Sequence, residues 1–482
     1  MTAITARKGV ILRTPTEVPD PEVPDGVTAA TVGPTGVGAV DPLVTVTEGG
    51  RTTLHTGCAP EETRAIADAA GDGLPTDRAD AVVEYDPDEV RFPATDLPGF
   101  EHDRRVLAGC GWRRPASADD HEAAGGFADA DEAWNVADEV RGRGWGDWSQ
   151  DAPLAGTWEA ARDAEGSVAV VVNAHGSVAD ALLLSSVPFE VLEGADVAAE
   201  TLGADAVVVY VSGADERALQ RARAAAEAYP DPAAPMDVVA GPPDYRAAEP
   251  TMAIEAIEGN HRLEARLRPP GPEEVGLHGR PTLVHTARTF AHLAVGLREG
   301  TADSRLVTLT GDVDAPATVE LPESDHIATA LDAAGADGYK AACVGGRFGG
   351  LTSTLEVAPD PETLADSGLG TEGTVEILGD GRCIVEFVGQ RARFAAEENC
   401  GRCVPCREGT TQLADLLGEV YAGKYERETL TELQRVMRTT SICEFGVTAG
   451  RPTRTAMENF ETEFEAHADG RCPAGVCMEA TT

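Results

Sequence analysis

Continuous apolar runs alternate with helical patterns through the middle of the chain, between residues 135 and 300. The runs at 168–173, 206–211 and 236–240 are typical of strands that are buried on both faces. Residues 191–202 and 216–229 carry apolar side chains at helical spacing. The alternation predicts a parallel sheet covered by helices, and the chain as a whole is predicted to be a multidomain α/β protein.

The region before this domain has weaker patterns. Residues 1–85 combine short apolar runs, such as 43–46, with a helix expected over 60–70, where Glu61 and Glu62 favour the helix start. These features predict a small α/β unit. Residues 86–134 are rich in Asp, Pro and Gly and are predicted to form a linker segment.

The region after residue 300 has a β-rich pattern first and a helical pattern towards its end. Residues 304–355 are predicted to form a small β-rich module with tight glycine turns, with strands at 306–309, 318–321 and 341–344 around one helix near 327–334. A connector over 356–392 leads to a helical domain at 393–470 and a tail at 471–482. The domain is predicted to be a bundle of three amphipathic helices, at 408–421, 428–438 and 455–465.

The charge of the chain narrows the possible partners. With 39 Lys and Arg against 82 Asp and Glu, its formal net charge is −43. So negative a surface excludes binding to nucleic acid or anionic lipid, and it is typical of a halophilic protein in a salt-rich cytosol. No stretch approaches the roughly 18 apolar residues of a membrane helix. We therefore expect a cytoplasmic protein, peripheral at most to a membrane complex and not inserted in the membrane.

The strongest chemical signal is a cysteine-rich loop, Cys400-Gly-Arg-Cys403-Val-Pro-Cys406, with a further cysteine at Cys443. Three thiolates at this spacing can bind three irons of one cubane, which leaves the fourth iron for a cysteine brought in by the fold. Closed zinc sites more often use two separate Cys-x-x-Cys pairs, so the pattern favours a [4Fe-4S] cluster over zinc. Arg402 and Arg407 beside the ligands either tune the cluster or are simply exposed.

These residues carry a family resemblance. The run from Glu398 to Gly409, followed by Ser441-Ile-Cys443, resembles the iron-sulfur region of the NADH-binding flavoprotein subunit of respiratory complex I and of related NAD-linked hydrogenases and formate dehydrogenases. The resemblance extends over roughly residues 105–470. It implies a Rossmann-like flavin-type domain for FMN and NADH, a β-grasp module at 304–355, a [4Fe-4S] cluster on Cys400, Cys403, Cys406 and Cys443, and other subunits of a redox complex as partners.

Several positions depart from the flavin-binding pattern of that family. The glycine-rich turn reads Gly142-Arg-Gly-Trp-Gly-Asp-Trp148, and an acidic run is reduced to Asn173-Ala-His175. The Val-Asn-Asn motif that contacts the flavin becomes Val284-His-Thr286. Each polar contact to a charged ligand contributes roughly 1.5 to 3 kcal/mol, so we do not expect FMN and NADH to bind in the family's manner. The residues that could still contact FMN are Arg143, Asn173 and Glu249.

The remaining cysteines form no comparable motif. The N-terminal unit is similar to part of a thioredoxin-like [2Fe-2S] domain, but Pro34 and Gly38 stand where that family places cysteines. Single cysteines, Cys383 among them, are interpreted as small buried hydrophobes. Cys472 and Cys477 form a close pair that could bind metal or form a reversible disulfide. We favour the vestige of a longer tail, because no other ligand follows and the pair alone completes no metal site.

The leading hypothesis is an iron-sulfur electron-transfer subunit of an NADH dehydrogenase-like oxidoreductase complex. One alternative is an active NADH:acceptor oxidoreductase that binds FMN through altered contacts. Another is a non-catalytic assembly module.

Overall fold

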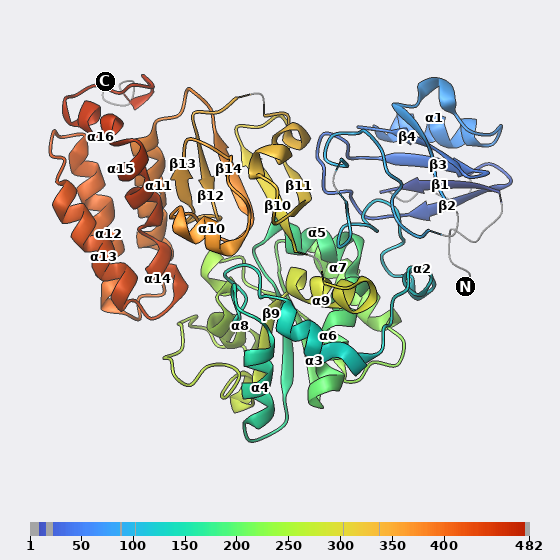
Figure 1. Cartoon of the computed structure of the whole chain (residues 1–482), viewed down its shortest axis with the longest axis horizontal. Coiled ribbons are helices and arrows are strands. Elements are labelled where there is room, and N and C mark those ends of the chain that lie inside the picture. The colour runs from blue at the N-terminus through green and yellow to red at the C-terminus, as the bar shows by residue number, and fades with distance from the viewer. Residues whose placement is uncertain are drawn as a thin grey trace.

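Three separate β-sheets and a helical bundle follow one another along the chain in the computed structural model (Figure 1). The structure describes residues 9–15, 23–86, 89–101, 103–301, 303–336 and 338–477, so the last five residues of the expected tail lie outside the described residues. The predicted multidomain α/β class is confirmed, with a parallel sheet in the middle domain and helices at the C-terminal end.

The first sheet has five strands in the order β2-β1-β3-β4-β5. β1 and β2 are parallel, and the other neighbours are antiparallel. Helix α1 spans the predicted 60–70 and buries Ile66 and Ala67 against Leu12 and Val46 of the sheet. The elements are β1 (Val10–Thr14), β2 (Val27–Thr31), β3 (Val44–Glu48), β4 (Arg51–His55), α1 (Pro60–Ala70) and β5 (Ala81–Glu84).

The segment expected to be a linker is packed between the first sheet and the third. The buried Arg13 guanidinium of β1 lies 3.7 Å from the ring centroid of Trp112 and donates to the Trp112 carbonyl. The Glu320 carboxylate accepts the backbone N–H groups of residues 105, 106 and 107. The segment therefore fixes the two sheets relative to each other; it contains α2 (Ala118–Ala123) and the start of the next domain's first helix, α3 (Ala133–Glu139).

The second sheet is the predicted parallel one, in the order β8-β7-β6-β9. Its central strand β6 is buried along its whole length, as the continuous apolar run requires. Helices cover both faces of the sheet, so the ends of its strands are the natural place for a binding site. The elements are α4 (Ala155–Asp163), β6 (Ala169–Ala174), α5 (Val178–Ser186), α6 (Pro188–Leu202), β7 (Ala206–Ser212), α7 (Glu216–Ala228), β8 (Met236–Gly241), α8 (Pro250–Ile257), β9 (Thr282–Thr286) and α9 (Ala287–Glu299).

The third sheet has five strands in the order β11-β10-β14-β12-β13. Four of them lie in the expected module at 304–355, and the fifth, β14, comes from the expected connector and inserts between β10 and β12. The helix expected near 327–334 is a 3₁₀ helix over Ile327–Ala334. The other elements are β10 (Ser304–Gly311), β11 (Ala317–Pro322), β12 (Ala341–Val344), β13 (Gly350–Thr352), α10 (Pro361–Asp366) and β14 (Thr374–Leu378).

The C-terminal bundle differs from the predicted three helices in two ways. A helix that was not predicted, α11, leads into the cysteine loop, and the helix predicted at 455–465 is two helices that meet at Phe460. Phe460 is not helical, with φ −134° and ψ 31°, so it divides the helical pattern. The elements are α11 (Ile384–Glu398), α12 (Val404–Val420), α13 (Arg427–Thr440), α14 (Glu444–Thr448), α15 (Arg451–Asn459) and α16 (Glu461–Ala468).

Candidate metal centre and flavin-type site

The four predicted cluster cysteines line one pocket of the bundle domain. Cys400 and Cys403 lie in the loop between α11 and α12, and Cys406 lies in the first turn of α12. Cys443 is the residue that caps the start of α14. Met252, Ala265, Ile442 and Phe445 complete an apolar lining. The fold therefore brings the distant fourth cysteine to the other three.

The cysteine loop is held in place by Asn399. Its side-chain nitrogen donates to the carbonyls of Ala395 and Ala396 at the end of α11, and its oxygen accepts the N–H of Gly401. Gly401 has a φ of +77°, which favours glycine. Arg407 donates to the Gly401 carbonyl at 2.9 Å, while Arg402 lines the pocket itself.

Burial and neighbouring negative charges disfavour the thiolate form of two of these cysteines. Burial, and then the charges of the three neighbouring thiols, raise the pKa of Cys406 far above its usual range. Burial, followed by the charge of Glu249, raises the pKa of Cys443 to about 12. These two thiols therefore stay protonated unless a bound cation compensates the charge of their thiolates. A donor set of four thiols in an apolar pocket therefore fits a [4Fe-4S] cluster.

The three residues predicted to contact FMN have most of their polar groups bonded inside the protein, although Nε of Arg143 is buried without a partner. Arg143 donates to the carbonyls of Arg141 and Ser304, and the Asn173 side chain donates to the carbonyls of Gly146 and Ala248, both at 2.8 Å. The Glu249 carboxylate caps α8 by accepting the N–H groups of Thr251 and Met252, and it pairs with Arg268. Of the three, only Glu249 lines a neighbouring pocket.

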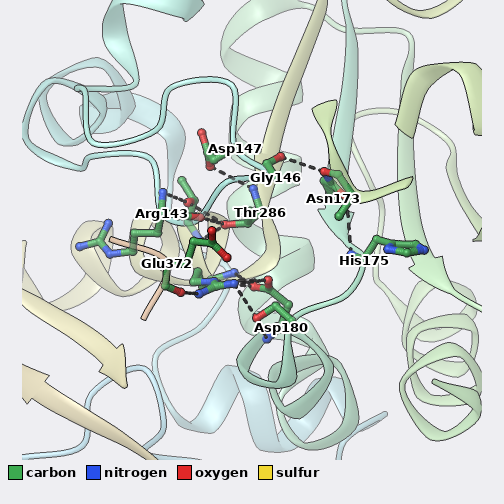
Figure 2. A network of polar contacts seen from close by, with 12 residues as sticks. Arg143, Gly146, Asp147, Asn173, His175, Asp180, Thr286 and Glu372 are labelled. Atoms are coloured by element: carbon green, nitrogen blue, oxygen red, sulfur yellow. Dashed lines mark hydrogen bonds and ion pairs between the residues drawn. The ribbon is translucent and has the colours of Figure 1, made fainter. Parts of the chain in front are cut away.

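A buried carboxylate lies at the start of α9, where a helix N-terminus would otherwise favour a phosphate. Asp147 accepts the Thr286 N–H at 3.0 Å (Figure 2). It also accepts the Ser149 N–H at 2.8 Å and a hydrogen bond from His285 Nδ1 at 2.9 Å. Burial opposes its charge, but His285 and the Thr286 N–H overcome that effect and lower the pKa of Asp147. The Asp147 carboxylate therefore occupies the anion position at the start of α9.

Trp145 forms a wall of two pockets beside this carboxylate. Its indole stacks on Tyr245 with ring centroids 4.7 Å apart. Tyr245 in turn packs edge-on against Phe348, Phe394 and Phe445, and Phe445 lines the cysteine pocket. A continuous group of aromatic rings therefore connects the altered turn to the metal centre.

Acidic side chains outnumber arginines around both pockets. One is lined by Asp180, Glu372 and Glu376 with Arg288 and Arg347, the other by Asp147, Asp151, Glu249 and Glu444 with Arg268 and Arg451. The Arg288 guanidinium is already bonded within the protein, because it forms an ion pair with Asp180 at 2.8 Å and donates to the Glu372 carbonyl. Burial, only partly offset by Arg451 and Arg288, raises the pKa of Glu372 to about 7.

The sequence analysis did not single out Asp180, Arg288 or Glu372. Asp180 is in the first turn of α5, Arg288 in the first turn of α9, and Glu372 lies just before β14. No spacing in the sequence connects these positions, because they meet only where the second and third sheets come together. Asp147 was visible as an acid in a glycine-rich turn, but its contact with His285 was not.

Cys383, Cys472 and Cys477 form a group that the sequence analysis did not expect. Their sulfur atoms and a nitrogen of His467 all lie within 4.8 Å of one another. The interpretation of Cys472 and Cys477 as a pair without further ligands is therefore corrected. The sequence showed the Cys472 and Cys477 pair but not its partners, because Cys383 and His467 are 84 residues apart. By contrast, Cys58, Cys110 and Cys343 are buried among apolar side chains, as small hydrophobes would be.

Within the part of the chain that the structure describes, no helix has the length and apolar character needed to cross a membrane.

Comparison with known protein families gives two matches along the chain. Residues 139–295 match the family described as the Nuo51 FMN-binding domain, and residues 386–467 match the NADH-ubiquinone oxidoreductase-F iron-sulfur binding region. The second match contains all four cysteines of the pocket.

Curated relatives agree with these matches. An NADH-quinone oxidoreductase subunit of Streptomyces coelicolor is 30% identical over 346 residues, which are 63% of this chain and 76% of the relative. An NADH-quinone oxidoreductase subunit of Rhizobium meliloti is 28% identical, over 62% of this chain and 79% of its own length. The alpha subunit of the NAD-reducing hydrogenase HoxS of Cupriavidus necator is 30% identical over 68% of this chain, which spans 59% of that longer protein.

Among solved structures, an NAD⁺-reducing [NiFe]-hydrogenase in the air-oxidised state has the same fold, with a TM-score of 0.66 and 22% identity over 96% of this chain and 86% of the other. The chain therefore belongs to the family of NADH-binding flavoprotein subunits found in NADH-quinone oxidoreductases and NAD-reducing hydrogenases.

Proposed function

We propose that this chain is an electron-transfer subunit of a redox complex, and that a single [4Fe-4S] cluster on Cys400, Cys403, Cys406 and Cys443 is its working centre. When bound, the cluster supplies a one-electron carrier. The observation that carries the proposal is the convergence of these four thiols on one apolar pocket.

The protein's own residues prepare this pocket for a cluster. Asn399 fixes the loop before any metal arrives, so the thiols need little rearrangement to bind iron. The apolar lining from Met252, Ala265 and Phe445 excludes water from the sulfur atoms. Arg402 places positive charge at the pocket, which favours the more negative reduced state of a cluster.

The residues of the flavin-type site do not suit FMN as the pocket residues suit a cluster. The N–H groups that could hold its phosphate are bonded to Asp147, and the pockets beside Trp145 contain more carboxylates than arginines. An added phosphate would lie against a buried carboxylate, and like charges at close range strongly oppose binding. We therefore propose that the flavin-type domain of this chain serves as a scaffold and performs no hydride transfer.

Anaerobic purification at high salt, followed by iron analysis and electron paramagnetic resonance, tests the proposal. The reduced protein is expected to show the signal of one [4Fe-4S]⁺ centre, which Cys403→Ser removes. The matched control Cys110→Ala changes a buried cysteine outside the pocket and is expected to keep the signal. Zinc in place of iron in the wild-type pocket would contradict the proposal.

A second candidate is an active NADH:acceptor oxidoreductase with FMN held by altered contacts. It is favoured by the match of residues 139–295 to the Nuo51 FMN-binding domain family and by the open pockets beside Trp145. Flavin released from the purified protein by acid, together with NADH oxidation by an artificial acceptor, would establish it. The absence of both after incubation with FMN would exclude it.

The relatives indicate what kind of partner this chain has, because they are themselves subunits of NADH-quinone oxidoreductase and of hydrogenases. We propose that this chain likewise exchanges electrons with other redox subunits. Purification of the complex from its native source and identification of the chains that remain bound would test this assignment.

A further inference from the structure

A second group of metal-binding side chains lies at the other end of α11. It consists of Cys383, His467, Cys472 and Cys477, whose ligand atoms all lie within 4.8 Å of one another. The Cys383 sulfur is 3.3 Å from Nε2 of His467. Among the described residues, one other group is as compact, His121 with Glu190 and Glu193. That group is already neutralised by Arg113 and Arg298.

The four side chains come from three separate parts of the bundle. Cys383 caps the start of α11, and His467 lies in the last turn of α16. Cys472 and Cys477 lie in the segment that follows α16. Cys383 and His467 are buried, and the other two are half-buried. The fold, rather than a local sequence motif, therefore assembles the group.

The histidine is oriented as a metal ligand. Its Nδ1 lies 2.7 Å from the Glu463 carbonyl, a bond in which Nδ1–H is the donor. That bond fixes the tautomer and leaves the lone pair of Nε2 directed toward Cys383. Metal-bound histidines in proteins almost always make such a second bond.

The sulfur atoms also have the surroundings of metal-bound thiolates. The Glu386 N–H donates to Cys383 at 3.3 Å, and the N–H groups of Ala474 and Cys477 donate to Cys472. Backbone N–H groups stabilise sulfur that carries negative charge. Tyr421 covers the group, with its ring 5.4 Å from that of His467 and its hydroxyl 3.9 Å from the Cys477 sulfur.

Three sulfurs and one nitrogen at this separation match one ion rather than a cluster. With Zn–S near 2.3 Å and Zn–N near 2.0 Å, the ligand atoms of a tetrahedral zinc site lie roughly 3.5 to 4 Å apart. We propose that Cys383, His467, Cys472 and Cys477 bind a structural zinc ion. The three thiols release their protons to solvent as the Zn–S bonds form, and the histidine binds through neutral Nε2.

Such an ion would fasten the C-terminal segment to the start of α11. The other end of that helix leads through Asn399 to the cysteine loop, and 15 helical residues span about 22 Å. The zinc site is therefore separate from the iron-sulfur pocket and braces the helix from which that pocket is built.

The test uses full-length protein purified anaerobically, with zinc and iron measured in the same samples. Wild type is expected to contain about one zinc ion per chain, and the double variant Cys472→Ser/Cys477→Ser less than about a tenth of that. The double variant is expected to retain its iron, whereas Cys403→Ser is expected to lose iron and keep zinc. Cys58→Ser, a cysteine of the first sheet domain, is the matched control and should change neither metal.

Because the double variant could fold poorly, a second measurement uses the wild-type protein alone. After removal of zinc by a chelator, Co²⁺ is added, and absorption bands of tetrahedral cobalt with thiolate ligands are expected at one equivalent. Wild-type protein without zinc, also after incubation with zinc chloride, would overturn the proposal. So would zinc that remains in the double variant, or a Cys472–Cys477 disulfide found by mass spectrometry under anaerobic conditions.

Discussion

The iron-sulfur pocket and the flavin-type site lie in the same chain but differ in how their polar groups are bonded. In the pocket, four thiols converge on a largely apolar space that Arg402 also lines. In the flavin-type site, Asp147, Asn173 and Arg143 bond to groups of the surrounding protein and leave few polar atoms free. The pocket therefore presents its sulfur atoms to a bound group, whereas most polar atoms at the altered turn are already bonded within the protein.

The largest expected effect tests the pocket. Cys443→Ser removes the one ligand contributed from outside the cysteine loop, so we expect the [4Fe-4S]⁺ signal to disappear and the iron content to fall below about four per chain. Paramagnetic resonance and iron analysis measure both. The buried Cys343→Ala serves as a control for the general loss of a cysteine. A normal signal from Cys443→Ser would mean that the cluster has another fourth ligand.

A second prediction tests the internal anion. Asp147→Asn weakens a buried carboxylate's bonds to His285 and to the Thr286 N–H, so the free energy of unfolding should fall by about 2 to 3 kcal/mol. Denaturant unfolding followed by tryptophan fluorescence measures it. Asp163→Asn, on an exposed residue paired with its neighbour Arg162, should change stability by less than about 0.5 kcal/mol. Equal effects of the two variants would contradict a structural role for Asp147.

A third prediction asks whether the turn alone excludes flavin. Trp145→Gly/Asp147→Gly opens the two pockets to each other and removes the carboxylate at the start of α9. FMN affinity should rise at least about tenfold, equivalent to roughly 1.4 kcal/mol. Quenching of FMN fluorescence on titration with protein gives the affinity. Trp134→Phe, at a tryptophan packed against Trp158 away from the turn, should leave it unchanged.

The smallest effect concerns pH. Burial, and then the charge of Arg143, hold the pKa of His292 well below its usual 6.5. Below pH 6.5 the unfolded chain therefore binds a proton that the folded chain does not. Stability is thus complete above that pH and declines below it, by up to about 1.4 kcal/mol per pH unit.

Thermal unfolding at about pH 5.5 and 7.5, on either side of the usual histidine pKa, measures this dependence. His292→Gln should reduce the loss of stability at the lower pH, because it removes the titrating group. His261→Gln changes an exposed histidine and should not. An unchanged pH dependence in His292→Gln would show that other groups are responsible.

The local elements of this fold could be predicted from the sequence where one pattern dominates. Helix α1 has the predicted bounds, and the strand β6 follows its continuous apolar run. β14 was missed because its five residues lie in a segment without a neighbouring strand in sequence, and its partners β10 and β12 are contributed from elsewhere. The break at Phe460 was not predicted, because the helical spacing of apolar residues over 455–465 continues across it.

Site residues were likewise predictable only where they lie close together in the sequence. Three cluster cysteines were visible because they crowd one loop. Cys443 was visible as a further cysteine, and the family resemblance supported its assignment as the fourth ligand. The complete Cys383 group could not be predicted, because Cys383 and His467 are far apart in the chain. Asp147 and His285 are likewise brought together by the sheet and the turn, and neither residue alone indicates the other.

The contact between Cys383 and His467 has a consequence for biosynthesis. It closes a loop of 84 residues, and all four cysteines of the iron-sulfur pocket lie inside that loop. The ribosome therefore adds every cluster ligand to the growing chain before it adds the residue that closes the loop. A cluster inserted before His467 docks on Cys383 would therefore be enclosed by that contact afterwards.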